Sequence, residues 1–189
     1  MKSQIRILLN DLNEYFRSFS KIAIAVSGGI DSLTLALIAG RSHSNVDIFH
    51  AISPAVPQEA TKRVKLFSDI ENWRLNLINT GEFNRNEYIT NPLNRCFYCK
   101  DSLYRTISNA ICDQSRVIFS GTNLDDLNEF RPGLDAAKIY NVTHPFVELM
   151  INKASIRHLS RNLGYDQLAK LPSSPCLSSR IETGIPIDS

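Results

Sequence analysis

The chain has 189 residues, of which 43% are hydrophobic and 21% charged, with a formal net charge of +2. This length allows one substantial core and is too short for two ordinary domains, so one compact unit is expected. The longest apolar run, Ile22 to Val26, is far below the roughly 18 residues of a membrane span, and no signal peptide is visible. We therefore expect a cytoplasmic protein that acts on a small molecule, because the mixed charge also disfavours nucleic acid as a partner.

The predicted elements alternate between helices and strands in chain order. Apolar spacing in the first part predicts helix 3–18, strand 21–26, helix 32–39, strand 45–52, helix 56–70 and strand 73–78. Residues 81–99 are polar and Asn-rich, which predicts a loop that carries Cys96 and Cys99. The remainder is predicted as helix 103–112, strand 116–120, helix 134–139, helix 153–163 and a closing loop, 171–189. Such alternation favours an α/β fold with a doubly wound parallel sheet.

The segment Ser27-Gly28-Gly29-Ile30-Asp31-Ser32 lies between the first predicted strand and its helix. Backbone N–H groups and the helix dipole converge on an anion at such a place, and glycines let the backbone approach phosphates. The carboxylate of Asp31 suits Mg²⁺ bridging to the β- and γ-phosphates of ATP. The segment is neither a Walker A loop nor a dinucleotide fingerprint. The alternative is a plain strand-to-helix turn in which Asp31 caps the helix.

A second polar loop, Gly121-Thr122-Asn123-Leu124-Asp125-Asp126, follows the fourth predicted strand. Ligands of open α/β sheets bind at the carboxyl ends of the strands, so Asp125 and Asp126 are candidates for binding Mg²⁺ or a ribose. Arg131 is a candidate for neutralising a phosphate. The alternative is an Asx-rich turn in which Asp125 caps a helix.

The cysteines allow three interpretations. Cys96, Cys99 and the distant Cys176 can supply three thiolates to a [4Fe-4S] cluster with one iron left open. A structural zinc site would need a fourth ligand such as His144 or His158, and buried small residues are the third possibility. As a lone cysteine, Cys176 could also attack an adenylate, and the nearby Arg180 would favour its thiolate form.

The loop at Ser27 resembles the Ser-Gly-Gly-x-Asp-Ser signature of the PP-loop ATPases, which cleave ATP to AMP and pyrophosphate. Three further segments follow this loop: residues 91–100, 121–133 and 175–181. Together with the loop, and in this order, they make the chain resemble the LarE family of ATP-dependent sacrificial sulfur transferases. This resemblance implies a pyridinium carboxylate mononucleotide substrate, adenylated at a carboxylate and converted to a thiocarboxylate during synthesis of the nickel-pincer nucleotide. Glu148, Lys153 and Arg157 also follow the family's pattern.

The resemblance implies a role for each candidate residue. Asp31, Cys176 and Arg180 are expected to be catalytic. Cys96, Cys99 and Cys176 match the three-cysteine subtype, in which a [4Fe-4S] cluster carries an extra sulfide; other members give up the sulfur of this last cysteine and keep dehydroalanine. ATP and Mg²⁺ are expected to be bound by Ser27, Gly28, Gly29, Asp31, Ser32, Gly121, Asn123, Asp125, Asp126 and Arg131.

The family's length sets the expected domain organisation. Residues 1–175 are expected to form the PP-loop domain, and 176–189 a cysteine-containing loop leading to a C-terminal domain that this chain lacks. In relatives that smaller α/β domain helps bind the substrate phosphate and build the oligomer, so a homo-oligomer is expected. The alternatives are a tRNA thiolase, which usually has lysine where Ile30 stands, an amide-forming synthetase, and an AMP-binding module without turnover.

Overall fold

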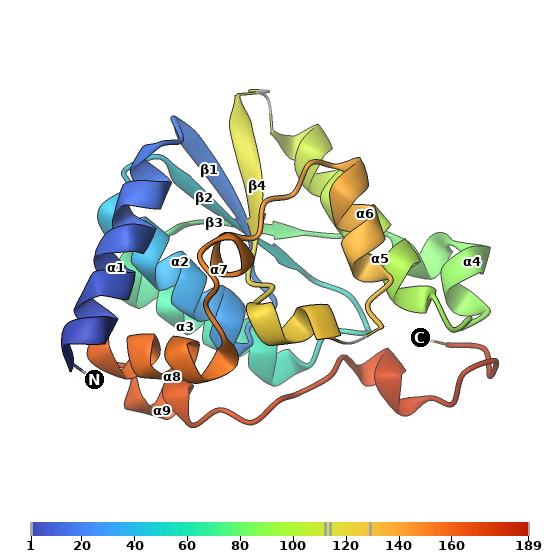
Figure 1. Ribbon diagram of the computed structural model, residues 1–189. Helices are drawn as coiled ribbons and strands as arrows, with labels where there is room; N and C mark the ends of the chain where they lie inside the picture. Colours follow the sequence, from blue (N-terminus) through green and yellow to red (C-terminus); the bar gives the residue numbers. More distant parts are fainter. Residues whose placement is uncertain (1, 112, 114, 129, 189) are drawn as a thin grey trace.

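A computed structural model describes residues 2–111, 113, 115–128 and 130–188, and a parallel β-sheet runs through its centre (Figure 1). The sheet has the strand order β3-β2-β1-β4. Its strands are β1 (Lys21–Ala25), β2 (Val46–Ala51), β3 (Arg74–Ile78) and β4 (Arg116–Ser120). In register, Ile24 of β1 lies beside Ile48 of β2 and Phe119 of β4. The predicted strands are therefore confirmed to within about two residues at their ends.

Helices cover both faces of the sheet (Figure 1). On one face, Ile22 and Ile24 pack with apolar residues of α1 (Lys2–Arg17), α2 (Ile30–Ser42), α3 (Gln58–Glu71) and α8 (Lys153–Asn162). On the other, Ala23 and Ala25 pack with residues of α5 (Arg95–Ala110) and α6 (Gly133–Ile139). Because β1 is apolar on both sides, it is suited to the middle of a sheet that is covered twice. The predicted doubly wound α/β fold is confirmed.

The short elements were largely beyond sequence reasoning. They are η1 (Glu82–Asn84), α4 (Asn86–Ile89), η2 (Leu124–Asn128), α7 (Pro145–Glu148), α9 (Asp166–Ala169) and η3 (Leu177–Arg180). Each is about one turn long, which is too short to show a helical period. The helix predicted from residue 32 also begins earlier, because Ile30 is buried and already belongs to α2.

The loop predicted over 81–99 is wrong in part, because it holds the short elements η1 and α4 and, at its carboxyl end, the start of α5. Helix α5 begins at Arg95, so Cys96 and Cys99 lie in its first two turns and not on a loop. The start is marked by Pro92, whose carbonyl accepts a hydrogen bond from the backbone N–H of Arg95 at 2.9 Å. The Asn-rich residues 91–94 directly before this turn favoured the loop prediction, and the predicted helix end at Cys112 lies outside the described residues.

The closing segment has little regular structure, as predicted, yet it is bound closely to the preceding part of the chain. The buried Asn91 side chain donates to the carbonyls of Glu182, at 2.9 Å, and Ile185, at 2.8 Å. The backbone N–H of Ile187 donates to Ile89 of α4 at 2.8 Å, and the Ile187 side chain is buried. These bonds fix the segment that carries Cys176 against α4 and the start of α5.

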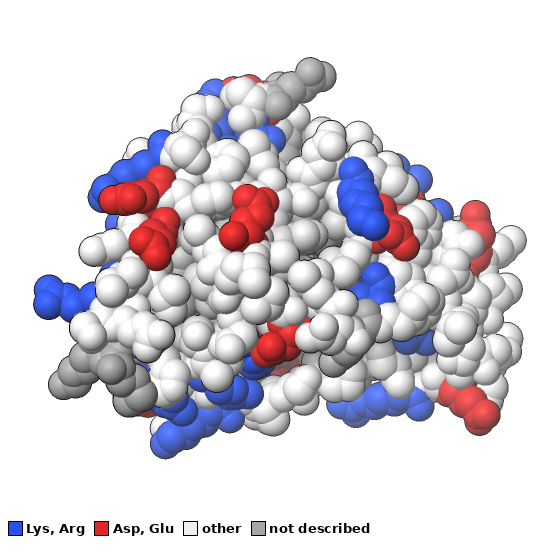
Figure 2. Space-filling view, in the orientation of Figure 1, with Lys and Arg blue, Asp and Glu red and all other residues white. Residues whose placement is uncertain are grey.

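The surface carries both signs of charge. Figure 2 shows Lys and Arg interspersed with Asp and Glu over the drawn face, with basic side chains more frequent along its lower edge. This face therefore lacks the continuous basic stripe that nucleic acid requires. Within the described ranges, every helix is too short or too polar to cross a membrane.

Candidate functional site

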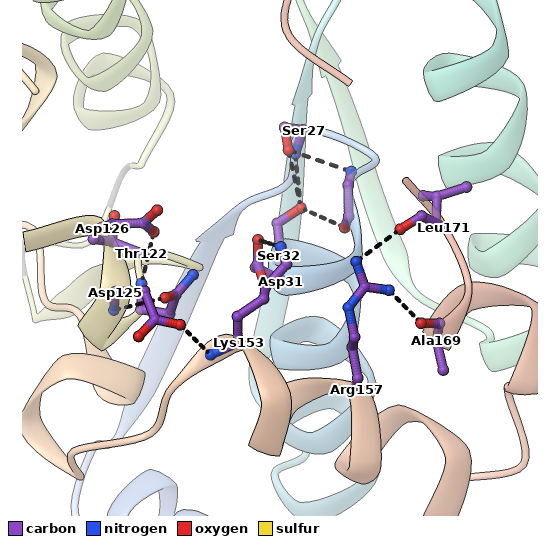
Figure 3. A network of polar contacts seen from close by, with 12 residues as sticks. Ser27, Asp31, Ser32, Thr122, Asp125, Asp126, Lys153, Arg157, Ala169 and Leu171 are labelled. Carbon is purple, nitrogen blue, oxygen red and sulfur yellow. Dashed lines mark hydrogen bonds and ion pairs between the residues drawn. The ribbon is translucent and has the colours of Figure 1, made fainter. Parts of the chain in front are cut away.

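Two serines hold the Ser27–Ser32 loop from within. The hydroxyl of Ser32 accepts a hydrogen bond from the backbone N–H of Ser27 at 3.1 Å and donates to the carbonyl of Gly29 at 3.2 Å. The hydroxyl of Ser27 lies 3.2 Å from that of Ser32 and accepts from the N–H of Gly29 at 3.3 Å. Figure 3 shows this ring of contacts at the start of α2. The loop is thus shaped before any ligand arrives.

Two glycines let neighbouring backbones touch this loop. Gly28 has a φ of +83°, and a Cβ built on it would lie 2.8 Å from the carbonyl oxygen of Ala60 in α3. A Cβ on Gly121 would lie only 2.6 Å from the backbone nitrogen of Ser32. The loop after β4 therefore packs directly on the first turn of α2, so the two polar segments singled out in the sequence form one site.

Asp31 and Lys153 meet at the centre of this site (Figure 3). The Nζ of Lys153 donates to one carboxylate oxygen of Asp31, while the other oxygen is buried without a hydrogen-bond partner in the described structure. Burial raises the pKa of Asp31, the ion pair with Lys153 opposes that rise, and the charge of Asp126 adds to it. An unpaired buried carboxylate oxygen is unfavourable unless a cation or a proton occupies it.

The second polar loop is organised by its own side chains. The buried Asn123 accepts from the backbone N–H of Asp125 at 3.0 Å. Asp126 accepts from the N–H of Asn123 at 2.9 Å and forms an ion pair of 2.7 Å with Arg131. Asp125 accepts from the backbone N–H of Lys153 at 3.0 Å, which ties the loop to α8. The Asx-type hydrogen bonding considered as an alternative is therefore present, and it brings the carboxylates beside the Ser27–Ser32 loop.

These carboxylates fit Mg²⁺. Magnesium is usually bound through one or two carboxylates together with substrate phosphates, and it does not require a complete cage of protein ligands. The unpartnered oxygen of Asp31 is such a ligand, and Asp126 is near enough to influence its charge. Asp31, with Asp126 beside it, would hold the ion.

The thiols gather at the start of α5. Cys96 is exposed, Cys99 and Cys176 are half-buried, and the first two lie one turn apart on the helix. The sulfur of Cys176 lies 3.1 Å from the hydroxyl of Ser179, which also accepts a hydrogen bond from Arg95 at 3.3 Å. Burial raises the pKa of Cys99 to about 12, Lys100 opposes the rise, and the neighbouring thiols Cys176 and Cys96 add to it.

The described residues do not form a metal centre as placed. Nowhere in the described ranges do three His, Cys, Asp or Glu side chains lie close enough together to hold a metal ion, and this covers the three cysteines. His144 binds the hydroxyl of Ser120 through Nδ1 at 2.8 Å, and His158 belongs to α8 on the other face of the sheet. The [4Fe-4S] and zinc interpretations of the thiols stay predictions.

The remaining residues of the family pattern form their hydrogen bonds outside the phosphate loop, although the charge of Arg157 opposes the rise in the pKa of Asp31. Glu148 accepts a hydrogen bond of 2.6 Å from the hydroxyl of Tyr15 in α1. Arg157 donates to the carbonyls of Ala169 and Leu171, so it anchors the chain leading to Cys176 (Figure 3). Arg180 is exposed at the end of η3, and its predicted effect on Cys176 stays a prediction.

Sequence reasoning missed Arg63. This residue of α3 donates from Nη1 to the carbonyl of Gly28 at 2.6 Å. Residues 56–70 show only an ordinary amphipathic pattern, so no local signal distinguishes this arginine from the other charges of the helix. It becomes visible only when α3 packs beside the loop.

Comparisons with known proteins agree with this architecture. No protein-family model matches the sequence. An uncharacterized protein of Synechocystis is 34% identical over 178 residues, and one of Methanocaldococcus jannaschii is 32% identical over 185 residues. The alignments include 93% of this chain and 66% of each relative, so the chain spans about two thirds of their length. The structure of an NMN synthetase from Francisella tularensis matches 91% of this chain and 75% of its own at a TM-score of 0.66 and 16% identity. The chain thus has the Rossmann-like α/β fold of that synthetase.

Proposed function

We propose that this chain is a PP-loop enzyme that uses ATP to adenylate a carboxylate and releases pyrophosphate. The observation that carries the proposal is the unpartnered carboxylate oxygen of Asp31, buried in the first turn of a helix that follows a glycine loop. A helix start attracts phosphates, whereas a carboxylate there repels them unless a cation lies between. ATP with Mg²⁺ satisfies both groups at once.

The residues of the site have separate tasks in this reaction. The N–H groups at the start of α2 have no partner within the helix and can donate to phosphate oxygens. Asp31 would hold Mg²⁺, which supplies neutralisation of the triphosphate charge when bound. Lys153, freed from its contact with Asp31, would then donate to a phosphate oxygen. A substrate carboxylate oxygen then attacks the α-phosphorus. The bond from this phosphorus to the bridging oxygen breaks, and pyrophosphate leaves with the electron pair.

We further propose that sulfur displaces the AMP. The substrate would be a pyridinium carboxylate mononucleotide, and the product a thiocarboxylate for the nickel-pincer nucleotide. The sequence resemblance supports this, as does the docking of the Cys176 segment beside α5. The thiolate of Cys176 attacks the acyl carbon, AMP departs with the carboxylate oxygen, and a thioester forms. Solvent water then takes the Cα proton of Cys176, the freed electron pair forms the Cα=Cβ double bond, and the Cβ–Sγ bond breaks with its electrons on sulfur, which frees the thiocarboxylate and leaves dehydroalanine.

The test is pyrophosphate release by the full chain with ATP, Mg²⁺ and nicotinate mononucleotide as the probe. The wild-type chain should release pyrophosphate only when the carboxylate is present. Asp31→Asn should lose most of this activity because it removes a full negative charge from the metal ligand. Cys176→Ser should still release pyrophosphate and form the acyl adenylate, but no thiocarboxylate. Wild-type protein that releases no pyrophosphate would refute the proposal.

An amide-forming synthetase is the second candidate, because the fold is shared with an NMN synthetase. It would use the same adenylate and replace AMP by an amine. Mass spectrometry of the product separates the two, since exchange of oxygen for sulfur and conversion to an amide give different masses. Unchanged product formation by Cys176→Ser, with ammonia supplied, would favour the synthetase.

A further inference from the structure

Two residues of helix α3 contact the phosphate loop at Gly28. Ala60 and Arg63 are three residues apart, so they lie on the same side of this helix. The carbonyl oxygen of Ala60 leaves no room for a Cβ on Gly28, and Arg63 donates to the carbonyl of Gly28 at 2.6 Å. Both contacts act on the same residue, whose φ is +83°.

The hydrogen bond from Arg63 fixes the orientation of a whole peptide group. The C=O of Gly28 and the N–H of Gly29 belong to one planar trans peptide, so they point in opposite directions. Because the carbonyl points to Arg63 on α3, the N–H of Gly29 points into the loop, where it meets the hydroxyl of Ser27 at 3.3 Å. A reversed peptide would turn the carbonyl oxygen of Gly28 into the loop.

Arg63 has no close carboxylate partner, although its charge adds to that of Lys62 in lowering the pKa of Glu59 on the same helix. Across the described ranges, no Asp or Glu oxygen lies within 4.0 Å of its guanidinium, and its hydrogen bond goes to a neutral carbonyl. The adjacent Lys62 differs, since it is exposed and pairs with Glu59 at 2.8 Å. A guanidinium has five N–H donors in a rigid fork, so most remain for an anion beside the loop.

We propose that Arg63 binds the pyrophosphate part of ATP while it holds the Gly28–Gly29 peptide in this orientation. This inference rests on the proposed function and assigns the β- and γ-phosphate end of the nucleotide to the α3 side of the loop. Arginine suits this place because its fork can bond to a carbonyl and a phosphate together. Arg63 then gives the site a higher affinity for ATP than for AMP, and it stabilises the leaving pyrophosphate.

The test compares Arg63→Met, Arg63→Lys and the control Lys62→Met in the full chain. Calorimetry measures the affinities for ATP with Mg²⁺, for AMP and for inorganic pyrophosphate, and thermal melting verifies folding. Arg63→Met should weaken ATP and pyrophosphate at least tenfold and leave AMP within about twofold. Arg63→Lys should recover only part of this loss, because lysine lacks the fork, and Lys62→Met should resemble the wild type.

The outcomes separate this inference from the proposed function. Equal affinity of wild type and Arg63→Met for ATP would overturn it, while carboxylate-dependent pyrophosphate release would leave the proposed function intact. An equal loss for ATP and AMP would also overturn it, because a merely structural contact disturbs the loop for both nucleotides. Wild-type protein that binds no ATP would refute the proposed function itself.

Discussion

Replacing Gly28 by alanine should damage both the fold and the phosphate loop. Gly164 is the matched control, because its φ is +93° and nothing lies within 4 Å of its Cβ position, whereas Gly28, at φ +83°, faces the carbonyl oxygen of Ala60 at 2.8 Å. Gly164→Ala should cost about 1–2 kcal/mol, from backbone strain alone. Gly28→Ala adds an overpacking term of about 1–3 kcal/mol, for a total of about 2–5 kcal/mol.

Thermal melting and ATP binding measure the two consequences. At about 2–4 °C per kcal/mol for a chain of this size, Gly164→Ala should lower Tm by about 2–8 °C and Gly28→Ala by about 4–20 °C. Only Gly28→Ala should also weaken ATP binding, because the methyl group pushes the loop away from α3. The reasoning would be refuted if the two variants had the same Tm and Gly28→Ala bound ATP like the wild type.

Three further predictions follow from the contacts of single side chains. Burial raises the pKa of Asp31, so the stability of the wild type should fall relative to that of Asp31→Asn as the pH rises through that pKa. Urea unfolding at several pH values measures the difference in the free energy of unfolding. A difference that does not change with pH, or that changes in the opposite direction, would contradict this prediction. Arg157→Met should expose residues 171–176 to limited proteolysis, whereas the exposed Arg161→Met should not, and equal cleavage would argue against the anchoring role. Tyr88→Phe should reduce the free energy of unfolding by about 1–3 kcal/mol in urea melts, because it leaves the buried Ser178 hydroxyl without its partner at 2.7 Å; an unchanged midpoint would contradict this.

The parts of the molecule that sequence predicted well are those encoded in contiguous residues. The strands Lys21–Ala25 and Arg116–Ser120 are short apolar runs with turn residues beside them, and the glycine loop is a continuous motif. The start of α5 was missed because the Asn-rich residues 91–94 run directly into its first turn, and one turn is too short to show the period that defines a helix. Even so, the placement of Cys96 and Cys99 one turn apart on that helix depends only on local structure.

The contacts that shape the site depend on tertiary packing and could not be predicted. Lys153 reaches Asp31 across 122 positions of sequence, and Arg63 reaches Gly28 from the neighbouring helix. Gly121 was expected to help bind the nucleotide, whereas the structure shows that its lack of a side chain also lets the β4 loop touch Ser32. Each of these depends on how two elements approach each other, which no local pattern records.

The most direct test of the account follows an isotope from the carboxylate to AMP. The full chain is incubated with ATP, Mg²⁺ and nicotinate mononucleotide labelled with ¹⁸O in both carboxylate oxygens, and the nucleotide product is weighed by mass spectrometry. Attack of the carboxylate on the α-phosphorus predicts AMP that carries one ¹⁸O atom once the acyl group has been transferred. Unlabelled AMP, or ADP with inorganic phosphate, would contradict adenylation at this site.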